Sequence, residues 1–289
     1  MAITLDGATI PNTISYAEAV MKRGFEGSVV GKLIPNKPVP MGEGIIPVIG
    51  DGFKLGVVGE GKAKPASDPG IEKAVLRPLK TAGILVVSEE VARKNPGGML
   101  DIIEQKLVQA VSYAVDCLVL FGVDPLAGTK IANQVYVNQT KSRVEMPGKD
   151  TVAEILAGYG LVDGDADGFA FDSRLRATIA MASQKNTIGP VMPNLATATD
   201  TVAGLPAAYG RVIGANKAKG FVGDWSKVHW GFASDIVLKQ STEASVVDGD
   251  GTEHRLWQEN KIGYLVETTI SATVLGVDEN FAAYDAPAA

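Results

Sequence analysis

Residues 42–61 are GEGIIPVIGDGFKLGVVGEG and residues 71–90 are IEKAVLRPLKTAGILVVSEE, joined by the polar segment KAKPASDPG. Two strand-like runs that flank a polar tip predict a long β-hairpin over residues 43–80. Pro47, Pro78 and the many glycines favour edge strands over the centre of a packed sheet. An isolated two-stranded hairpin is marginally stable in water. We therefore expect this hairpin to lie on another surface, and a second copy of the protein is the obvious supplier.

A long amphipathic helix is predicted after the hairpin. Asn95-Pro96-Gly97-Gly98 interrupts the preceding structure, and Gly122 ends the helix. The apolar positions follow three- and four-residue steps, and they are Leu100, Ile103, Leu107, Ala110, Val111, Ala114, Leu118 and Phe121. The opposite face is expected to carry Asp101, Glu104, Lys106, Gln109, Ser112 and Asp116. The pattern predicts a rod of roughly 35 Å that is too charged to cross a membrane.

Composition narrows the class of protein. The 289 residues can form one large domain or two intertwined ones, and the net charge is −6. This charge, without a dense Lys/Arg run, argues against a nucleic-acid-binding protein. Cys117 is the single cysteine, and its place in the helix predicts a buried, inert thiol. The N-terminus lacks the pattern of a signal peptide, so we expect a cytoplasmic protein.

The remaining pattern mixes helices and strands, which predicts an α+β fold. Helices are expected from Ser15 to Gly24, over 88–93, over 150–157 and over 172–183. Strands are expected within 25–39 and at 169–171, 211–215, 221–222, 229–232, 236–240 and 263–277.

No motif predicts an enzyme or a cofactor. Residues 56–62 resemble a phosphate-binding loop, but Ala63 replaces the required Ser or Thr and Pro65 blocks the helix that must follow. Asp163, Asp165 and Asp167 match the first half of a calcium loop, but Arg174 stands where a bidentate Glu is needed. A surface turn explains the same residues. A calcium-binding β-rich enzyme is thus a remote hypothesis.

The histidines add no metal site. His229 and His254 are the two histidines, and their spacing from each other and from the cysteine fits no metal-ligand pattern. His229 is expected to be a strand residue.

The order of parts resembles the tailed-bacteriophage major capsid protein family, which has the Hong Kong 97 fold. The matching segments run through nearly the whole chain. They are Lys64-Pro65-Ala66-Ser67-Asp68, Lys80-Thr81-Ala82, Ser88-Glu89-Glu90, the helix from Met99 to Gly122, Gly204-Leu205-Pro206, Gly223-Asp224-Trp225 and the run from Arg255 through Glu267 to Phe281.

The resemblance implies a domain plan. Residues 1–30 would be the N-terminal arm and residues 43–80 the extended loop. Residues 31–42, 81–126 and 237–271 would form the peripheral domain, with a spine helix over 98–121. Residues 127–236 and 272–289 would form the axial domain that packs around five- and six-fold axes.

The resemblance also implies a function. The chain would assemble, as hexamers and pentamers, into the icosahedral shell of a double-stranded DNA virion in the bacterial host cytoplasm. Portal, scaffolding or decoration proteins are expected partners, and the shell would enclose DNA without tight sequence-specific binding. Because the arm begins almost at Met1, a scaffold is expected to be a separate protein or dispensable. An encapsulin, a bacterial compartment shell of the same fold, is the alternative.

Some members of this family cross-link their subunits through an isopeptide bond between a Lys and an Asn, with a Glu as catalyst. The resemblance places Lys64 at the Lys, Asn260 at the Asn and Glu267 at the Glu. The alternative is that Lys64 is a solvated charge at the loop tip, Asn260 a turn residue and Glu267 an ion-pair partner.

Overall fold

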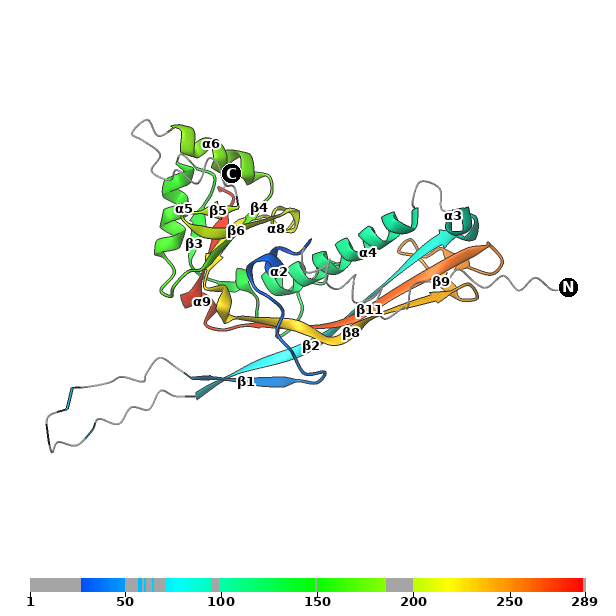
Figure 1. The fold of residues 1–289 in the computed structure, drawn as a ribbon, viewed down its shortest axis with the longest axis horizontal. Helices are drawn as coiled ribbons and strands as arrows, with labels where there is room; N and C mark the ends of the chain where they lie inside the picture. The colour runs from blue at the N-terminus through cyan, green and yellow to red at the C-terminus, as the bar shows by residue number, and fades with distance from the viewer. Residues whose placement is uncertain are drawn as a thin grey trace.

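The computed structural model describes residues 27–49, 57–58, 60, 64, 71–94, 99–148, 150–185 and 200–287. The predicted N-terminal helix from Ser15 and most of the segment that resembles a phosphate loop lie outside these residues. The described chain contains a four-stranded sheet, a six-stranded sheet and a two-stranded hairpin, with helices packed between and around them (Figure 1). The expected mixture of helices and sheets is confirmed.

The elongated four-stranded sheet has the order β1-β2-β11-β8 and is antiparallel throughout. Its strands are β1 (Gly44–Ile49), β2 (Ile71–Ser88), β8 (Val228–Ser241) and β11 (Lys261–Val274). β2 pairs with β1 from Ile71 to Leu76 and with β11 from Arg77 to Ser88. The described residues thus contain the base of the predicted hairpin, and its second arm continues into the body as one 18-residue strand.

The long helix follows β2 and the short helix α3 (Glu89–Lys94), whose first turn is capped by the Ser88 hydroxyl. α4 (Met99–Asp116) passes directly into a π-helical turn, Cys117–Phe121. Gly122 ends it with a left-handed backbone, at φ 60°. A Cβ at this position would lie 2.2 Å from a ring carbon of Tyr136, so both the backbone and the packing require glycine.

Most of the predicted apolar stripe of the long helix is buried where the structure describes its side chains, but Ala110 is exposed. Leu107 and Val111 of α4 pack against Val266 of β11. Ser112 and Asp116, expected on the solvent face, are instead buried. The reason is tertiary, because the helix α2 (Val29–Leu33) packs against this side of α4.

Two segments expected to be strands are helical. The predicted strand within 25–39 contains α2, whose N-cap Ser28 accepts a hydrogen bond from the Gly31 N–H at 3.1 Å. The predicted strand at 211–215 is α8 (Arg211–Ala215). Both contain β-branched residues that favour strands, but here those side chains are buried against neighbouring elements. Packing therefore overrides local propensity.

The six-stranded sheet has the order β3-β12-β7-β4-β6-β5. Two of its pairings are parallel, β3 with β12 and β4 with β6. Its strands are β3 (Arg143–Glu145), β4 (Gly168–Asp172), β5 (Thr201–Val202), β6 (Leu205–Gly210), β7 (Ala218–Gly223) and β12 (Phe281–Asp285).

Helices cover both faces of this sheet, so its central strand is buried throughout, as predicted for residues 169–171. Phe169 and Phe171 share a core with α5 (Thr151–Gly160) and α6 (Leu175–Lys185). Ala170 lies in the other core, which includes α2, α8 and the end of the long helix. The helices predicted over 150–157 and 172–183 are confirmed, and the Asp150 carboxylate caps α5 by accepting from the N–H groups of Val152 and Ala153.

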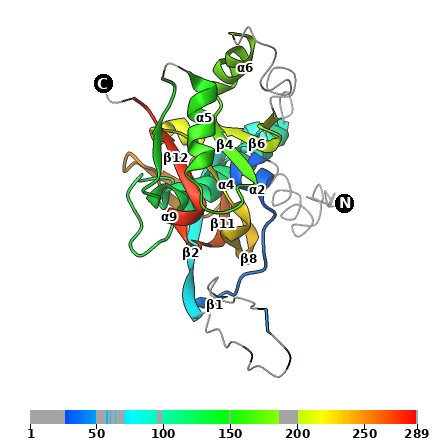
Figure 2. The same cartoon turned by 90° about the vertical axis from the view of Figure 1, so that its left-hand side faces the viewer.

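The remaining elements are short. β9 (Ser245–Val247) and β10 (Glu253–Arg255) form a hairpin around the predicted Gly249–Gly251 turn, and α9 (Val277–Asn280) precedes β12. The strands expected at 229–232 and 236–240 are one strand, β8. Among the described residues, no helix is long and apolar enough to cross a membrane. Figure 2 shows β1 and β2 leaving the body at the end opposite α5 and α6.

Candidate assembly interface

The arm, defined as β1 with residues 71–76 of β2, projects from the body (Figures 1 and 2). Among the described residues, β1 has β2 as its one strand partner. Apolar side chains of the arm face solvent, and Ile45 is 62% exposed. At the base, the Arg77 guanidinium donates to the Asn133 carbonyl at 3.0 Å and lies 3.5 Å from the Glu43 carboxylate. The arm is thus attached at its base, while its apolar side chains are left for another surface to cover.

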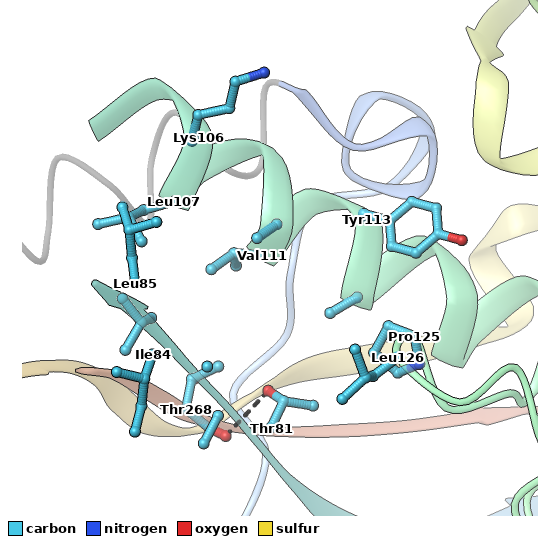
Figure 3. A pocket seen from close by; sticks show the side chains of 15 residues that line it. Thr81, Ile84, Leu85, Lys106, Leu107, Val111, Tyr113, Pro125, Leu126 and Thr268 are labelled. Atoms are coloured by element: carbon cyan, nitrogen blue, oxygen red, sulfur yellow. Dashed lines mark hydrogen bonds between the residues drawn. The ribbon is translucent and has the colours of Figure 1, made fainter. Parts of the chain in front are cut away.

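An apolar groove lies between α4 and β2, and we call it the α4 groove (Figure 3). Its volume is about 350 Å³, and small residues line both walls, Ala82 and Gly83 on β2 and Ala110 and Ala114 on α4. Because these side chains are short, the helix and the strand cannot fill the space between them. Leu126 at the groove is 97% exposed and Ile84 is 52% exposed. The groove is therefore an open apolar surface of the kind that marks interaction sites.

A buried carboxylate joins α4 to the segment that leads into the arm. Asp116 accepts hydrogen bonds from the Ser28 hydroxyl at 2.6 Å, the Val29 N–H at 3.0 Å and the Val30 N–H at 3.1 Å. Burial raises the pKa of this carboxyl to about 6, although the three donors and the charge of Lys32 act in the opposite direction. Asp116 thus holds the N-terminus of α2 against the long helix.

Cys117 follows Asp116 in the buried π-helical turn. Burial raises the pKa of its thiol to about 11. A thiol with so high a pKa is almost entirely protonated at neutral pH and reacts slowly. The predicted burial of Cys117 is confirmed.

The structure separates Lys64 from Asn260 within one chain. Lys64 is exposed and precedes β2 by seven residues, while the residue after Asn260 pairs with Ser88 at the far end of β2. β2 is roughly 55 Å long at ~3.3 Å per residue, and a seven-residue link spans at most about 25 Å. A bond between Lys64 and Asn260 therefore has to join two chains.

Glu267 also lies away from Asn260. It is a residue of β11, seven residues further along the chain. Asn260 is a turn residue with φ 50°, and its carbonyl accepts from the Glu89 N–H at 2.7 Å. The Glu267 carboxylate is 2.6 Å from the Lys80 ammonium, which holds the pKa of Glu267 below its usual value. In the isolated chain, Glu267 is an ion-pair partner of Lys80.

Of the three calcium candidates, only Asp167 has a side chain that the structure shows in a contact with the fold. Asp167 accepts from the Trp225 N–H at 2.7 Å, and the backbone N–H of Asp163 donates to the Glu279 carbonyl. Asp165 is exposed. Within the described part of the chain, no three His, Cys, Asp or Glu residues are arranged to hold a metal ion. A calcium site stays a prediction from sequence.

His229 is a residue of strand β8, as predicted, and burial lowers its pKa. His254 lies at the β9–β10 hairpin, where its two ring nitrogens are 3.1 Å from Asp248 and 3.4 Å from Glu259. Each ring nitrogen thus has its own carboxylate, and the arrangement ties the hairpin to the turn that follows it.

Solved structures from phages share this fold over almost the whole chain. A chain from Gordonia phage Cozz is 25% identical with a TM-score of 0.73, covering 91% of this chain and 87% of its own. A chain from Mycobacterium phage Ogopogo is 22% identical with a TM-score of 0.73, covering 90% and 92%. The capsid of an empty GTA particle is 12% identical with a TM-score of 0.58, covering 91% and 90%.

The sequence is also similar to a phage protein. A capsid polyprotein of Pseudomonas phage PAJU2 is 24% identical over an alignment of 241 residues that covers 77% of this chain and 35% of that protein. The chain is thus similar in sequence to a phage capsid polyprotein and in fold to chains from phages. It spans about a third of the length of this curated relative. No family model matches the sequence.

Two structural features of the chain are not predicted from its sequence. The α4 groove depends on the spacing between a helix and a strand, and the alanines and glycine that line it are common everywhere. The buried Asp116 lies on the polar side of the predicted helix, and its partners are more than eighty residues away. One sign of this burial is in the sequence: the residues on both sides of Asp116 are apolar, so that end of the helix has few polar residues that could face solvent.

Proposed function

We propose that this chain is a structural major capsid protein, many copies of which form the icosahedral shell of a tailed double-stranded DNA phage. The observation that carries the proposal is the shared fold over about nine-tenths of the chain with phage structures, one of them 25% identical. The similarity to a phage capsid polyprotein supports it independently. The role of such a subunit is structural, and its chemistry lies in contacts between copies.

The proposed domain plan follows the Hong Kong 97 type. The spine helix and the parts of β2, β8 and β11 that lie within these ranges would belong to the peripheral domain, residues 31–42, 81–126 and 237–271. The six-stranded sheet with α5 and α6 would form the axial domain, residues 127–236 and 272–289. Residues 1–30 would be the N-terminal arm and 43–80 the extended loop. Both β8 and β11 run across the proposed boundary, so the two domains would share a continuous sheet rather than a flexible linker.

The partners proposed are further copies of the chain, in hexamers and pentamers, together with portal, scaffolding or decoration proteins. Assembly would take place in the bacterial host cytoplasm, and the shell would enclose DNA. The arm supports assembly from many copies, since a two-stranded extension needs a second surface to be stable.

Electron microscopy of the purified, assembled protein tests the proposal. Closed icosahedral shells that hold genomic DNA when isolated from producing cells are expected. Shells that hold enzyme cargo and no genome would instead indicate an encapsulin. A protein that forms no shell under any assembly condition, alone or with its neighbouring phage proteins, would contradict the capsid function.

Covalent cross-linking is a separate proposal about the same shell. Glu267 would accept a proton from the Lys64 ammonium, and the neutral Lys64 amine of one copy would then attack the Asn260 side-chain carbonyl of another. A second proton of that amine would pass to the Asn260 amide nitrogen, which leaves as ammonia as the new amide bond forms. Because Asn260 and Glu267 are separated by roughly 23 Å of extended chain, Glu267 would come from a copy other than the one that supplies Asn260. The Lys80 pair would have to open first.

Denaturing gels of boiled shells test the cross-link. A ladder that collapses to monomer with Lys64→Ala, but persists with the matched tip variant Lys62→Ala, is expected. A single monomer band from the unmodified shell would exclude the reaction.

A further inference from the structure

We infer that Lys37 and His229 form an acid-sensitive latch, which holds the segment between α2 and β1 on strand β8 and releases it when His229 is protonated. We call this segment, residues 35–43, the strap. The inference concerns the single chain and goes beyond the proposed capsid function. Three observations carry it: the contacts of the strap, the chemistry of the two side chains and the charges around them.

The strap joins α2 to the first strand of the arm and forms no helix or strand of its own (Figure 2). Three of its residues are prolines, which lack an N–H group, so the strap cannot pair as a continuous strand. Its Lys37 N–H donates to the Trp230 carbonyl of β8 at 2.9 Å. The backbones lie so close that a Cβ added at Gly231 would be 2.0 Å from the Lys37 carbonyl oxygen. Lys37 therefore attaches the strap to β8.

The Lys37 side chain adds three polar contacts to this attachment. Its ammonium lies 3.2 Å from the Ser226 carbonyl oxygen, 3.5 Å from the Val228 carbonyl oxygen and 3.5 Å from His229 Nδ1. An ammonium has donors and no acceptor, so Nδ1 has to be the acceptor in this contact. A neutral imidazole with its proton on Nε2 can accept, whereas an imidazolium carries a proton on both nitrogens and cannot. The contact thus requires neutral His229.

The surrounding charges favour a neutral imidazole beside a charged amine. Burial lowers the pKa of Lys37, but the Asp224 carboxylate, which accepts from the Ser226 N–H at 3.0 Å, acts in the opposite direction. Burial and the charge of Lys37 both lower the pKa of His229. The residue opposite His229 on β11 is Thr273, which is uncharged. Because the ordinary pKa of lysine is far above that of histidine, the imidazole is the group that stays neutral at pH 7.

Acid places two positive charges in this contact. Two unit charges 3.5 Å apart repel each other, even in bulk water, by enough to change an equilibrium about sevenfold. His229 binds a proton less tightly in the folded chain than in the unfolded one. Its contribution to holding the strap is therefore complete above about pH 6.5 and is lost as the pH falls below that value. The backbone pairing of β1 with β2 contains no titratable group, so the strap is freed while the arm keeps its hairpin.

The other end of the same segment responds to pH in the opposite direction. Asp116 holds the start of α2, and burial raises the pKa of its carboxyl to about 6. Acid neutralises this carboxylate and strengthens its contribution. Lowering the pH is therefore expected to loosen the strap and to leave α2 in place, which distinguishes a local latch from acid unfolding of the whole chain.

Hydrogen exchange of the purified full chain tests the latch. Mass spectrometry compares the peptides of the strap and of α2 at pH 7.5 and pH 5, after correction for the intrinsic effect of pH on exchange. In the unmodified protein the protection of the strap should fall about sevenfold at pH 5, and that of α2 should not fall. His229→Gln keeps a side-chain acceptor for the Lys37 ammonium and does not titrate, so its strap should be equally protected at both pH values.

His254→Gln is the matched control, because His254 is the other of the two histidines. This variant should keep the full acid response of the strap. It also has a single imidazole, so its NMR titration reports His229 alone, and adding Lys37→Met should raise the midpoint of that titration. Circular dichroism at pH 7.5 verifies that each variant is folded.

Four results would overturn the inference. A full acid response in folded His229→Gln would show that another group titrates. Unchanged protection of the unmodified strap between the two pH values would show that nothing opens. An equal loss of protection in α2 would show unfolding of the whole chain. An NMR midpoint that does not move with Lys37→Met would show that the ammonium does not act on His229.

Discussion

At the scale of a single residue, Asp116 places a carboxylate inside the protein, where it accepts three hydrogen bonds at the start of α2. Burial raises the pKa of its carboxyl from 3.8 to about 6, so the folded state binds this proton more tightly than the unfolded state does. The stabilising contribution of Asp116 is therefore complete below about pH 4 and is lost as the pH rises through about 6. We expect a loss on the order of 3 kcal/mol for a shift of this size.

The substitution Asp116→Asn isolates this effect, because it keeps the shape and removes the titration. Denaturant unfolding of unassembled subunits between pH 4.5 and 7 should show a fall in the free energy of unfolding for the unmodified protein that is smaller in the variant. Parallel pH curves for the two proteins would show that Asp116 does not titrate in this range. Asn also loses one hydrogen bond, since its amide NH2 would face a backbone N–H.

At the scale of the element, α4 is held to the sheet by few side chains. Leu107 is buried against Val111 and Val266 and also lines the α4 groove. Leu107→Ala should lower the free energy of unfolding by about 2–3 kcal/mol, the lower part of the usual range, because part of the new space opens to an existing groove. Thermal or denaturant unfolding measures this. Ile102→Ala, at an exposed position on the same helix, should cost much less.

The extended loop, residues 43–80, which includes the arm, is the element that should separate assembly from folding. Deleting residues 62–70 shortens an extension whose described base contacts the body through few groups, so the subunit should fold with nearly unchanged stability. Shell formation should fail, because the arm is the part expected to reach a neighbour. Circular dichroism and electron microscopy report the two properties. Aggregation of the deletion variant, together with normal assembly of Leu107→Ala, would reverse the proposed roles of arm and helix.

At the scale of the whole molecule, the net charge of −6 affects how strongly isolated subunits bind DNA. Tight binding to double-stranded DNA draws on the release of counterions by clustered Lys and Arg, and this chain has no excess of them. Isolated subunits should therefore bind free DNA weakly at physiological salt in a mobility-shift assay. Tight binding that falls steeply with added salt would contradict this and would indicate a basic inner surface.

The sequence by itself determined the elements whose local signals agree. The Gly122 stop, the Ser88 and Asp150 caps, the buried 169–171 strand and the base of the hairpin all follow from residue type and spacing, because caps, turns and periodicity act over a few residues. The order of these parts was enough to indicate the capsid family.

Tertiary structure decided what depends on contacts between distant residues. The segments around Val29 and Val212 form helices because their branched side chains are buried against other elements, although their local preference is for strands. Asp116 is buried because α2 covers it, and the α4 groove exists because small side chains meet across a helix and a strand. Distant chain segments come together only in the folded molecule, so no local pattern in the sequence shows which residues they bring into contact.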